Sequence, residues 1–87
     1  MTDDGPFEFP CAFPVKVFGQ NDGTFRTHVS AIIASHFGDL GPEQISENVS
    51  RNGRFVSITF TVEAQDRSSL DDVYQALSGD SQILMAL

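Results

Sequence analysis

The chain has 87 residues, a length that corresponds to one domain with a single small core. Hydrophobic residues make up 40% of it, and five basic against twelve acidic side chains give a net charge of −7. Because nucleic-acid phosphates and anionic membrane surfaces repel such a chain, we expect neither nucleic acid nor a membrane among its partners.

The first part of the chain, residues 1–10, is acidic and is interrupted by one glycine and two prolines. This composition predicts a flexible acidic arm before a single domain over residues 11–87. The arm lacks the basic start and apolar middle of a signal peptide, and no apolar run approaches the roughly 20 residues of a membrane helix, so we expect a cytoplasmic location. Cys11 is the single cysteine, which excludes an intrachain disulfide, and no role is assigned to it.

The next segment predicts a strand, a loop and a helix. Residues 11–18 alternate apolar and other side chains, which is typical of a strand, and residues 19–23 (GQNDG) predict a loop. Residues 24–37 carry an apolar stripe at helical spacing, and Gly38 is the expected stop. The stripe consists of Phe25, Val29, Ile32, Ile33 and Phe37.

Two strands, residues 45–51 and 54–64, flank Asn52-Gly53, a strong signal for a hairpin with a two-residue turn. The turn predicts the register of the two strands, because it fixes which residues lie opposite each other. The expected pairs are Arg51 with Arg54, Val49 with Val56, Glu47 with Ile58 and Ile45 with Phe60. Glu47 then points toward the core side, as in an edge strand that an inward charge protects.

The last elements are a helix over residues 68–78, which Gly79 ends, and a strand over residues 83–87. The order is therefore β-α-β-β-α-β. The clean alternation of residues 56–63 indicates that helices cover only one face of the sheet. We predict an α+β, ferredoxin-like βαββαβ sandwich, in which a four-stranded antiparallel sheet carries two helices on one face.

Three segments carry a family resemblance: residues 8–19 (EFPCAFPVKVFG), residues 56–60 (VSITF) and residues 83–87 (ILMAL). They resemble the YbeD-like family of small bacterial proteins, over about residues 8–87. The resemblance implies a fold similar to ACT-type regulatory domains, which are small modules that bind amino acids and regulate enzymes. The family has no accepted active site, so no functional residue is carried over from it.

The loop before the first helix is the candidate ligand site. Its glycines allow close approach of a ligand to the backbone, and a helix N-terminus offers free N–H groups to an anion. The candidate residues are Gly19, Gln20, Asn21, Asp22, Gly23 and Thr24. The alternative is a plain turn in which Asp22 or Thr24 caps the helix, and the charge of Asp22 favours the cap over an anion.

An enzyme is the second alternative. The stretch from Gly19 to Arg26, together with Asn52-Gly53, resembles acylphosphatase, a hydrolase of the same topology. That enzyme uses a phosphate-cradling loop with an arginine, and an asparagine that positions water. Asp22 would repel phosphate and the turn explains Asn52, so we expect no enzyme here. His28 and His36 are not spaced as paired ligands, and we expect neither a metal nor a cofactor.

The candidate partner contacts lie on the hairpin tip and on the uncovered face of the sheet. Arg51 and Arg54 place two of the five basic residues at one tip, where an acidic partner could bind. Ser57, Thr59 and Thr61 give the open face an uncharged polar surface, and an edge strand is a third docking surface. The sequence predicts a non-enzymatic regulatory or interaction module that binds a small ligand or a protein partner, with a homodimer left open.

Overall fold

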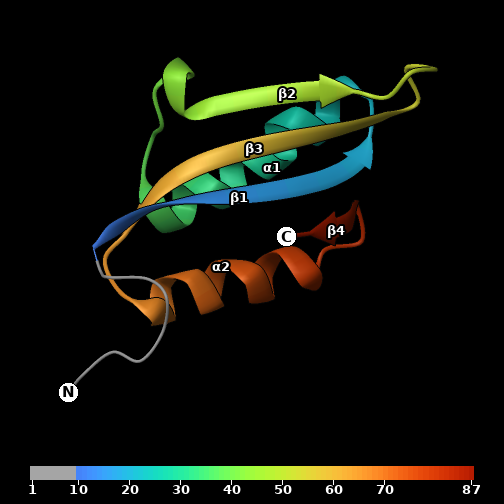
Figure 1. Cartoon of the computed structure of the whole chain (residues 1–87). Coiled ribbons are helices and arrows are strands. Elements are labelled where there is room, and N and C mark those ends of the chain that lie inside the picture. The colour runs from blue at the N-terminus through green and yellow to red at the C-terminus, as the bar shows by residue number, and fades with distance from the viewer. Residues whose placement is uncertain (1–9) are drawn as a thin grey trace.

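The computed structural model describes residues 10–87 (Figure 1). The predicted acidic arm lies outside the described residues, except for Pro10. The elements in chain order are β1 (Cys11–Gln20), α1 (Gly23–Phe37), a short 3-10 helix η1 (Pro42–Gln44), β2 (Ile45–Val49), β3 (Phe55–Ala64), α2 (Arg67–Ser78) and β4 (Ile83–Ala86). Within this part of the chain, no helix is both long enough and apolar enough to cross a membrane.

The four strands form one antiparallel sheet in the order β2-β3-β1-β4. The long strands β1 and β3 are central, and the short strands β2 and β4 are the edges (Figure 1). This order and the β-α-β-β-α-β sequence of elements confirm the predicted ferredoxin-like fold.

A single core lies between one face of the sheet and the two helices. Alternate residues of β1 and β3 are buried there, and each helix adds three side chains from its apolar stripe. The buried residues are Val15, Val17, Phe25, Val29, Ile33, Val56, Ile58, Phe60, Val62, Ala64, Leu70, Val73 and Leu77. Both helices therefore cover the same face, and the opposite face of the sheet is open.

Aspartates cap both helices. The carboxylate of Asp22 accepts the N–H of Phe25 at the start of α1, and that of Asp66 accepts the N–H of Ser69 at the start of α2. Gly38 ends α1 with φ of 80°, a left-handed conformation that glycine adopts without strain. The predicted cap and stop of the first helix are both confirmed.

The hairpin has the predicted register, with Val49 opposite Val56 and Ile45 opposite Phe60. The predicted two-residue turn, however, is wrong. The N–H of Gly53 bonds to the backbone oxygen of Ser50, so the turn begins at Ser50 and the strands end earlier than expected. The physical reason lies in side chains: the Ser50 hydroxyl accepts the N–H of Phe55, and the side-chain oxygen of Asn52 accepts that of Arg54.

Candidate functional site

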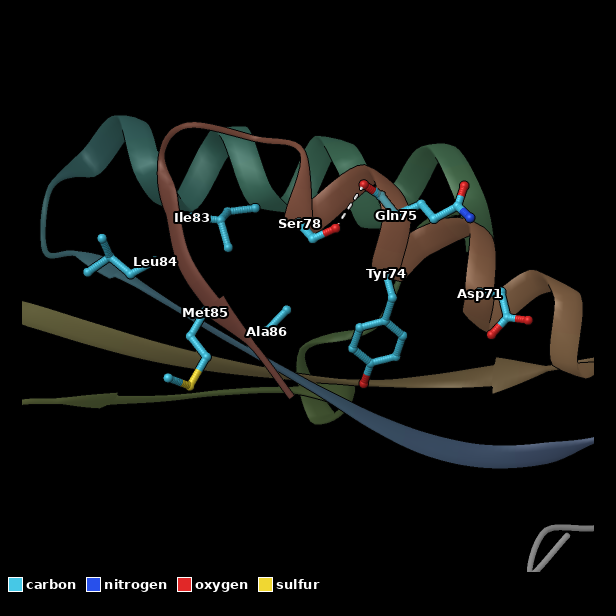
Figure 2. A pocket seen from close by; sticks show the side chains of 8 residues that line it. All are labelled: Asp71, Tyr74, Gln75, Ser78, Ile83, Leu84, Met85 and Ala86. Atoms are coloured by element: carbon cyan, nitrogen blue, oxygen red, sulfur yellow. Dashed lines mark hydrogen bonds between the residues drawn. The ribbon is translucent and has the colours of Figure 1, made fainter.

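A groove of about 490 Å³ lies between α2 and β4 (Figure 2). Polar side chains of α2 form one wall, and apolar side chains of β4 form the other. The lining residues are Asp71, Tyr74, Gln75, Ser78, Ile83, Leu84, Met85 and Ala86. Asp71 is the one charged side chain among these described lining residues.

The floor of the groove is an unpaired strand edge. Beyond β4 the sheet has no further strand among residues 10–87, and Leu87 exchanges both backbone hydrogen bonds with Lys16. Bonded and non-bonded pairs alternate in an antiparallel ladder, so the pair of Val17 and Ala86 is a non-bonded one. The N–H and C=O groups of Ala86 therefore point away from β1, toward the free side of the sheet.

Apolar side chains surround this free edge. Leu84, Met85 and Leu87 are 59%, 53% and 61% exposed, and they are three of the five large apolar side chains that the described structure leaves exposed. The sequence patterns predict an edge strand as a docking surface but do not assign these residues to it. The signal that could have found them is the run of five consecutive apolar residues, 83–87, on a strand that the topology places at an edge.

Tyr74 connects the two walls of the groove. Its hydroxyl donates a hydrogen bond of 2.5 Å to the backbone oxygen of Leu87, and its ring lies beside Ala86 in Figure 2. Partial burial raises the pKa of Tyr74 above its usual range. The groove is thus fixed at its Leu87 end by a contact between α2 and the end of the sheet.

The opposite edge of the sheet differs in charge. Glu47 of β2 lies opposite the buried Ile58 and therefore points toward the helix side, as the sequence predicted. There the Nε atom of Arg26 in α1 donates to both carboxylate oxygens of Glu47 at 3.0 Å. An inward charge of this kind disfavours the pairing of a further strand with an edge strand. The β4 strand, in contrast, carries no ionisable side chain.

The predicted ligand loop forms a cap. Asp22 accepts hydrogen bonds from the Thr24 hydroxyl at 2.7 Å and from the N–H of Phe25 at 2.8 Å, and these bonds lower the pKa of its carboxyl group. The carboxylate thus occupies the position that an anion would take at this helix N-terminus. Gly19 is explained by packing, because a Cβ there would lie 2.2 Å from the Phe25 ring.

The structure brings this loop to the hairpin tip. Asn21 donates its backbone N–H to the oxygen of Arg54 and its side-chain amide to the oxygen of Gly53, both at 2.9 Å. Two candidate surfaces that are about 30 residues apart in sequence therefore form one end of the molecule. Arg51 and Arg54 are both exposed there, and Gln20 pairs with Phe55 at the adjoining strand ends.

The residues that the hydrolase alternative needs have other partners. Arg26 pairs with Glu47, and Asn52 accepts hydrogen bonds from Ser50 and Arg54 inside its own turn. Arg26 also lies against Asp22, whose backbone oxygen accepts a hydrogen bond of 3.4 Å from the Nη1 atom of Arg26. The two groups that the hydrolase alternative would use are thus engaged in contacts within the chain.

The polar residues predicted on the open face lie beside an aromatic side chain. Ser57, Thr59 and Thr61 are half-buried on it, in the middle of β3. Beside them Phe18 lies under the Lys16 ammonium, whose Nζ is 5.9 Å from the ring centroid. A further hollow of about 200 Å³ lies at the hairpin end of this face, lined by Phe18, Asn48, Val49, Ser50, Phe55, Val56 and Ser57.

The two histidines have separate surroundings, as their spacing predicted. The Nε2 atom of His28 lies 2.5 Å from the Asp80 carboxylate, whereas the Nδ1 atom of His36 lies 3.0 Å from the backbone oxygen of Ile32. Across residues 10–87, no three His, Cys, Asp or Glu side chains gather in a way that could hold a metal ion. Cys11 is a half-buried free thiol.

Comparison with known proteins identifies the family. A UPF0250 protein of Nitrosomonas europaea is 34% identical over the whole of both chains, and one of Chromobacterium violaceum is 37% identical over 93% of this chain and 91% of its own. The solution structure of HP0495 from H. pylori superposes with a TM-score of 0.68 at 18% identity, over 100% of this chain and 94% of that one, which supports the fold. The resemblance to the YbeD-like family is thereby confirmed. Residues 4–87 match the family described as "Protein of unknown function (DUF493)", and the chain belongs to that family.

Proposed function

We propose that this protein is a non-enzymatic interaction module that binds a protein partner along the free edge of β4. The observation that carries the proposal is the contrast between the two sheet edges. The edge of β2 carries the inward Glu47 with its Arg26 partner, whereas β4 is apolar and uncharged and lies beside a groove. Exposed apolar edge strands recruit further strands, and folded proteins usually blunt them.

A protein partner suits this site better than a small ligand because of the shape and chemistry of the surface. The outward N–H and C=O groups of Ala86 match the hydrogen-bonding pattern of an extended backbone. The exposed side chains of Leu84, Met85 and Leu87 lie along this edge, where a chain can cover them. Covering them removes apolar surface from water at about 25 cal/mol per Å².

A capture experiment tests the proposal. The tagged protein is used to capture partners from a lysate of its native bacterium, and the captured proteins are identified by mass spectrometry. Leu84→Lys places a charge on the β4 edge, and we expect it to abolish the capture of the specific partner. Ser46→Lys places the same charge on the exposed side of β2 and is the matched control. Equal capture by both variants would overturn the β4 edge as the binding surface.

A small ligand is the second candidate, and one hollow supports it. A cavity of about 220 Å³ beside the predicted loop is lined by Gln20, Asp22, Phe25, Ser81, Gln82 and Leu84. The carboxylate of Asp22 matches an amine-bearing ligand such as an amino acid better than an anion. Titration with millimolar amino acids, followed by the amide shifts of Gly23, Thr24 and Phe25, tests this candidate. Amides that stay still would remove it.

The non-enzymatic part of the proposal has its own test. Hydrolysis of an acyl phosphate is measured for the wild type and for Arg26→Ala, since Arg26 is the arginine that the hydrolase alternative would use. We expect no turnover above the uncatalysed rate in either protein. Turnover by the wild type that the substitution abolishes would establish the hydrolase instead.

A further inference from the structure

We infer that the partner of the β4 edge is an extended apolar segment that runs antiparallel to β4 and carries a basic residue at its N-terminal end. This inference deepens the proposed function and rests on it. The β4 register gives the direction of the segment, the groove gives its central side chain, and Asp71 gives its charge.

The direction follows from the free groups of Ala86. In an antiparallel pair one residue exchanges both backbone hydrogen bonds with a single opposite residue, whereas a parallel pair distributes them over two. The strand β4 has four residues, with a register shift opposite Phe18 and Gly19, so only a short ladder can form here, and a parallel ladder is slightly less stable per residue than an antiparallel one. An antiparallel segment centred on Ala86 satisfies both groups with one partner residue.

The groove selects the central side chain. Ala86 pairs with the buried Val17 and therefore faces the helix side of the sheet, so the partner residue opposite Ala86 also points to that side. There its side chain enters the groove beside the ring of Tyr74 (Figure 2). The small side chain of Ala86 leaves the space for it. The volume of about 490 Å³ accommodates a Leu, Ile or Phe side chain.

The flanking residues of the segment lie on the open face. Met85 pairs with Phe18 and shares that face with it, and Leu87, two residues further along, has the same orientation. The partner residues on either side of the central one therefore meet two exposed apolar side chains. β-Branched residues at these positions would pack against Met85 and Leu87.

Charge determines which end of the segment carries the basic residue. Asp71 lies three residues before Tyr74 on the same face of α2, and Tyr74 bonds to Leu87, so Asp71 marks the Leu87 end of the groove (Figure 2). An antiparallel segment begins at that end, which places a basic residue near its N-terminus beside Asp71. The net charge of −7 attracts such a segment and opposes a second copy of this chain.

The test uses three acetylated synthetic peptides and the full chain. The first has two lysines followed by Val-Thr-Leu-Thr-Val, the second has two aspartates in place of the lysines, and the third has the lysines after the apolar part. Binding is followed by amide shifts of Leu84, Met85 and Ala86. We expect the first peptide to bind about two- to fivefold more tightly than either of the others, the range of an exposed ion pair.

The matched variants are Asp71→Asn and Asp72→Asn, which remove one charge from neighbouring positions on α2, of which only Asp71 lines the groove. Asp71→Asn should remove the preference for the first peptide over the third, which has the same net charge, and Asp72→Asn should retain it. A preference for the first peptide over the third that survives Asp71→Asn, a preference for the third peptide, or concentration-dependent self-association through β4 would overturn the inference. If none of the peptides binds while capture from the lysate still depends on Leu84, the inference fails and the proposed function stands.

Discussion

The hydroxyl of Tyr74 in α2 donates a hydrogen bond to the backbone oxygen of Leu87, so the second helix holds the end of the sheet edge. The same oxygen accepts the N–H of Lys16 in β1 at 3.1 Å. One acceptor therefore joins α2, β1 and the end of β4. Tyr74→Phe removes one donor and should lower the free energy of unfolding by about 0.5–1.5 kcal/mol.

The measurement for Tyr74→Phe is hydrogen exchange at Leu87 together with urea unfolding. Exchange should accelerate more at Leu87 than at Ile58 in the central strand, where it should follow only the loss of global stability. Tyr74 is the single tyrosine of the chain, so absorbance reports its ionisation directly, and its pKa should lie above 10.0 in the wild type. An ordinary pKa for Tyr74, together with unchanged hydrogen exchange at Leu87, would show that the hydrogen bond to Leu87 does not hold the Tyr74 ring in place.

Phe60 is the second prediction, because it is a fully buried aromatic residue at the centre of β3. Phe60→Ala should lower the free energy of unfolding by about 3–5 kcal/mol, through lost burial and the cavity left behind. Thr59→Ala, on the open face of the same strand, should cost much less. Denaturant unfolding of the two variants measures both, and equal losses would mean that the open face is covered.

Gly19 provides the third prediction. Gly19→Ala places a Cβ 2.2 Å from the buried Phe25 ring and should destabilise the domain by about 1–3 kcal/mol. Gly23→Ala is the matched control, since a Cβ there meets nothing within 4 Å and alanine favours the helix. Thermal unfolding should therefore separate the two variants in opposite directions. A neutral Gly19→Ala would show that the loop is loosely packed.

Asp22 gives the fourth prediction, since its carboxylate caps α1. Asp22→Ala should lower the Tm by about 4–8 °C, the effect of losing one N-cap in a domain of this size. Ser30→Ala, at an exposed position of the same helix, is the control and should leave the Tm nearly unchanged. A Tm that does not move for Asp22→Ala would mean that another group takes over the cap.

The fifth prediction concerns pH. The pKa values of Asp22, Asp66 and Asp80 all lie below the ordinary value of 3.8, chiefly because the Thr24 hydroxyl, the N–H of Ser69 and the N–H of Gln82 bond to the ionised carboxylates. Since the folded state holds these protons less tightly than the unfolded state, the stabilisation is complete above about pH 4. It is lost as the pH falls through the lowered values.

Urea unfolding between pH 2 and pH 7 measures this loss. Asp80→Asn should flatten part of the acid dependence, and it should also weaken the link between His28 and the loop after α2, because the Asp80 and His28 side chains are hydrogen-bonded. An acid dependence that is the same in the wild type and in this variant would contradict the role given to Asp80.

Sequence patterns predicted the fold well because each element carries its own signal. The alternation in β3 and the helical stripe from Phe25 to Phe37 do not depend on distant residues. The hairpin turn was missed because Ser50 and Asn52 compete with the backbone for its N–H groups, a choice that depends on local side-chain geometry.

The groove could not be predicted in the same way. Its shape depends on the register shift of β4 and on the contact between Tyr74 and Leu87. Both features depend on how two segments meet, and the residue pattern of one segment alone does not describe that. The contact between Asn21 and Gly53 is likewise a product of the assembled sheet. Sequence alone therefore identified the edge strand, and the structure identified the residues that line the groove beside it.

The ion pair between Arg26 and Glu47 has a consequence for the size of any complex. Fibres and open-ended arrays grow when a subunit has two adhesive ends, one to receive a neighbour and one to offer to the next. Here the β2 edge of the sheet carries the Arg26–Glu47 ion pair, whereas the β4 edge is open. If a partner strand adds at β4 as proposed, addition stops after that strand, and the expected product is a complex of one domain with one partner.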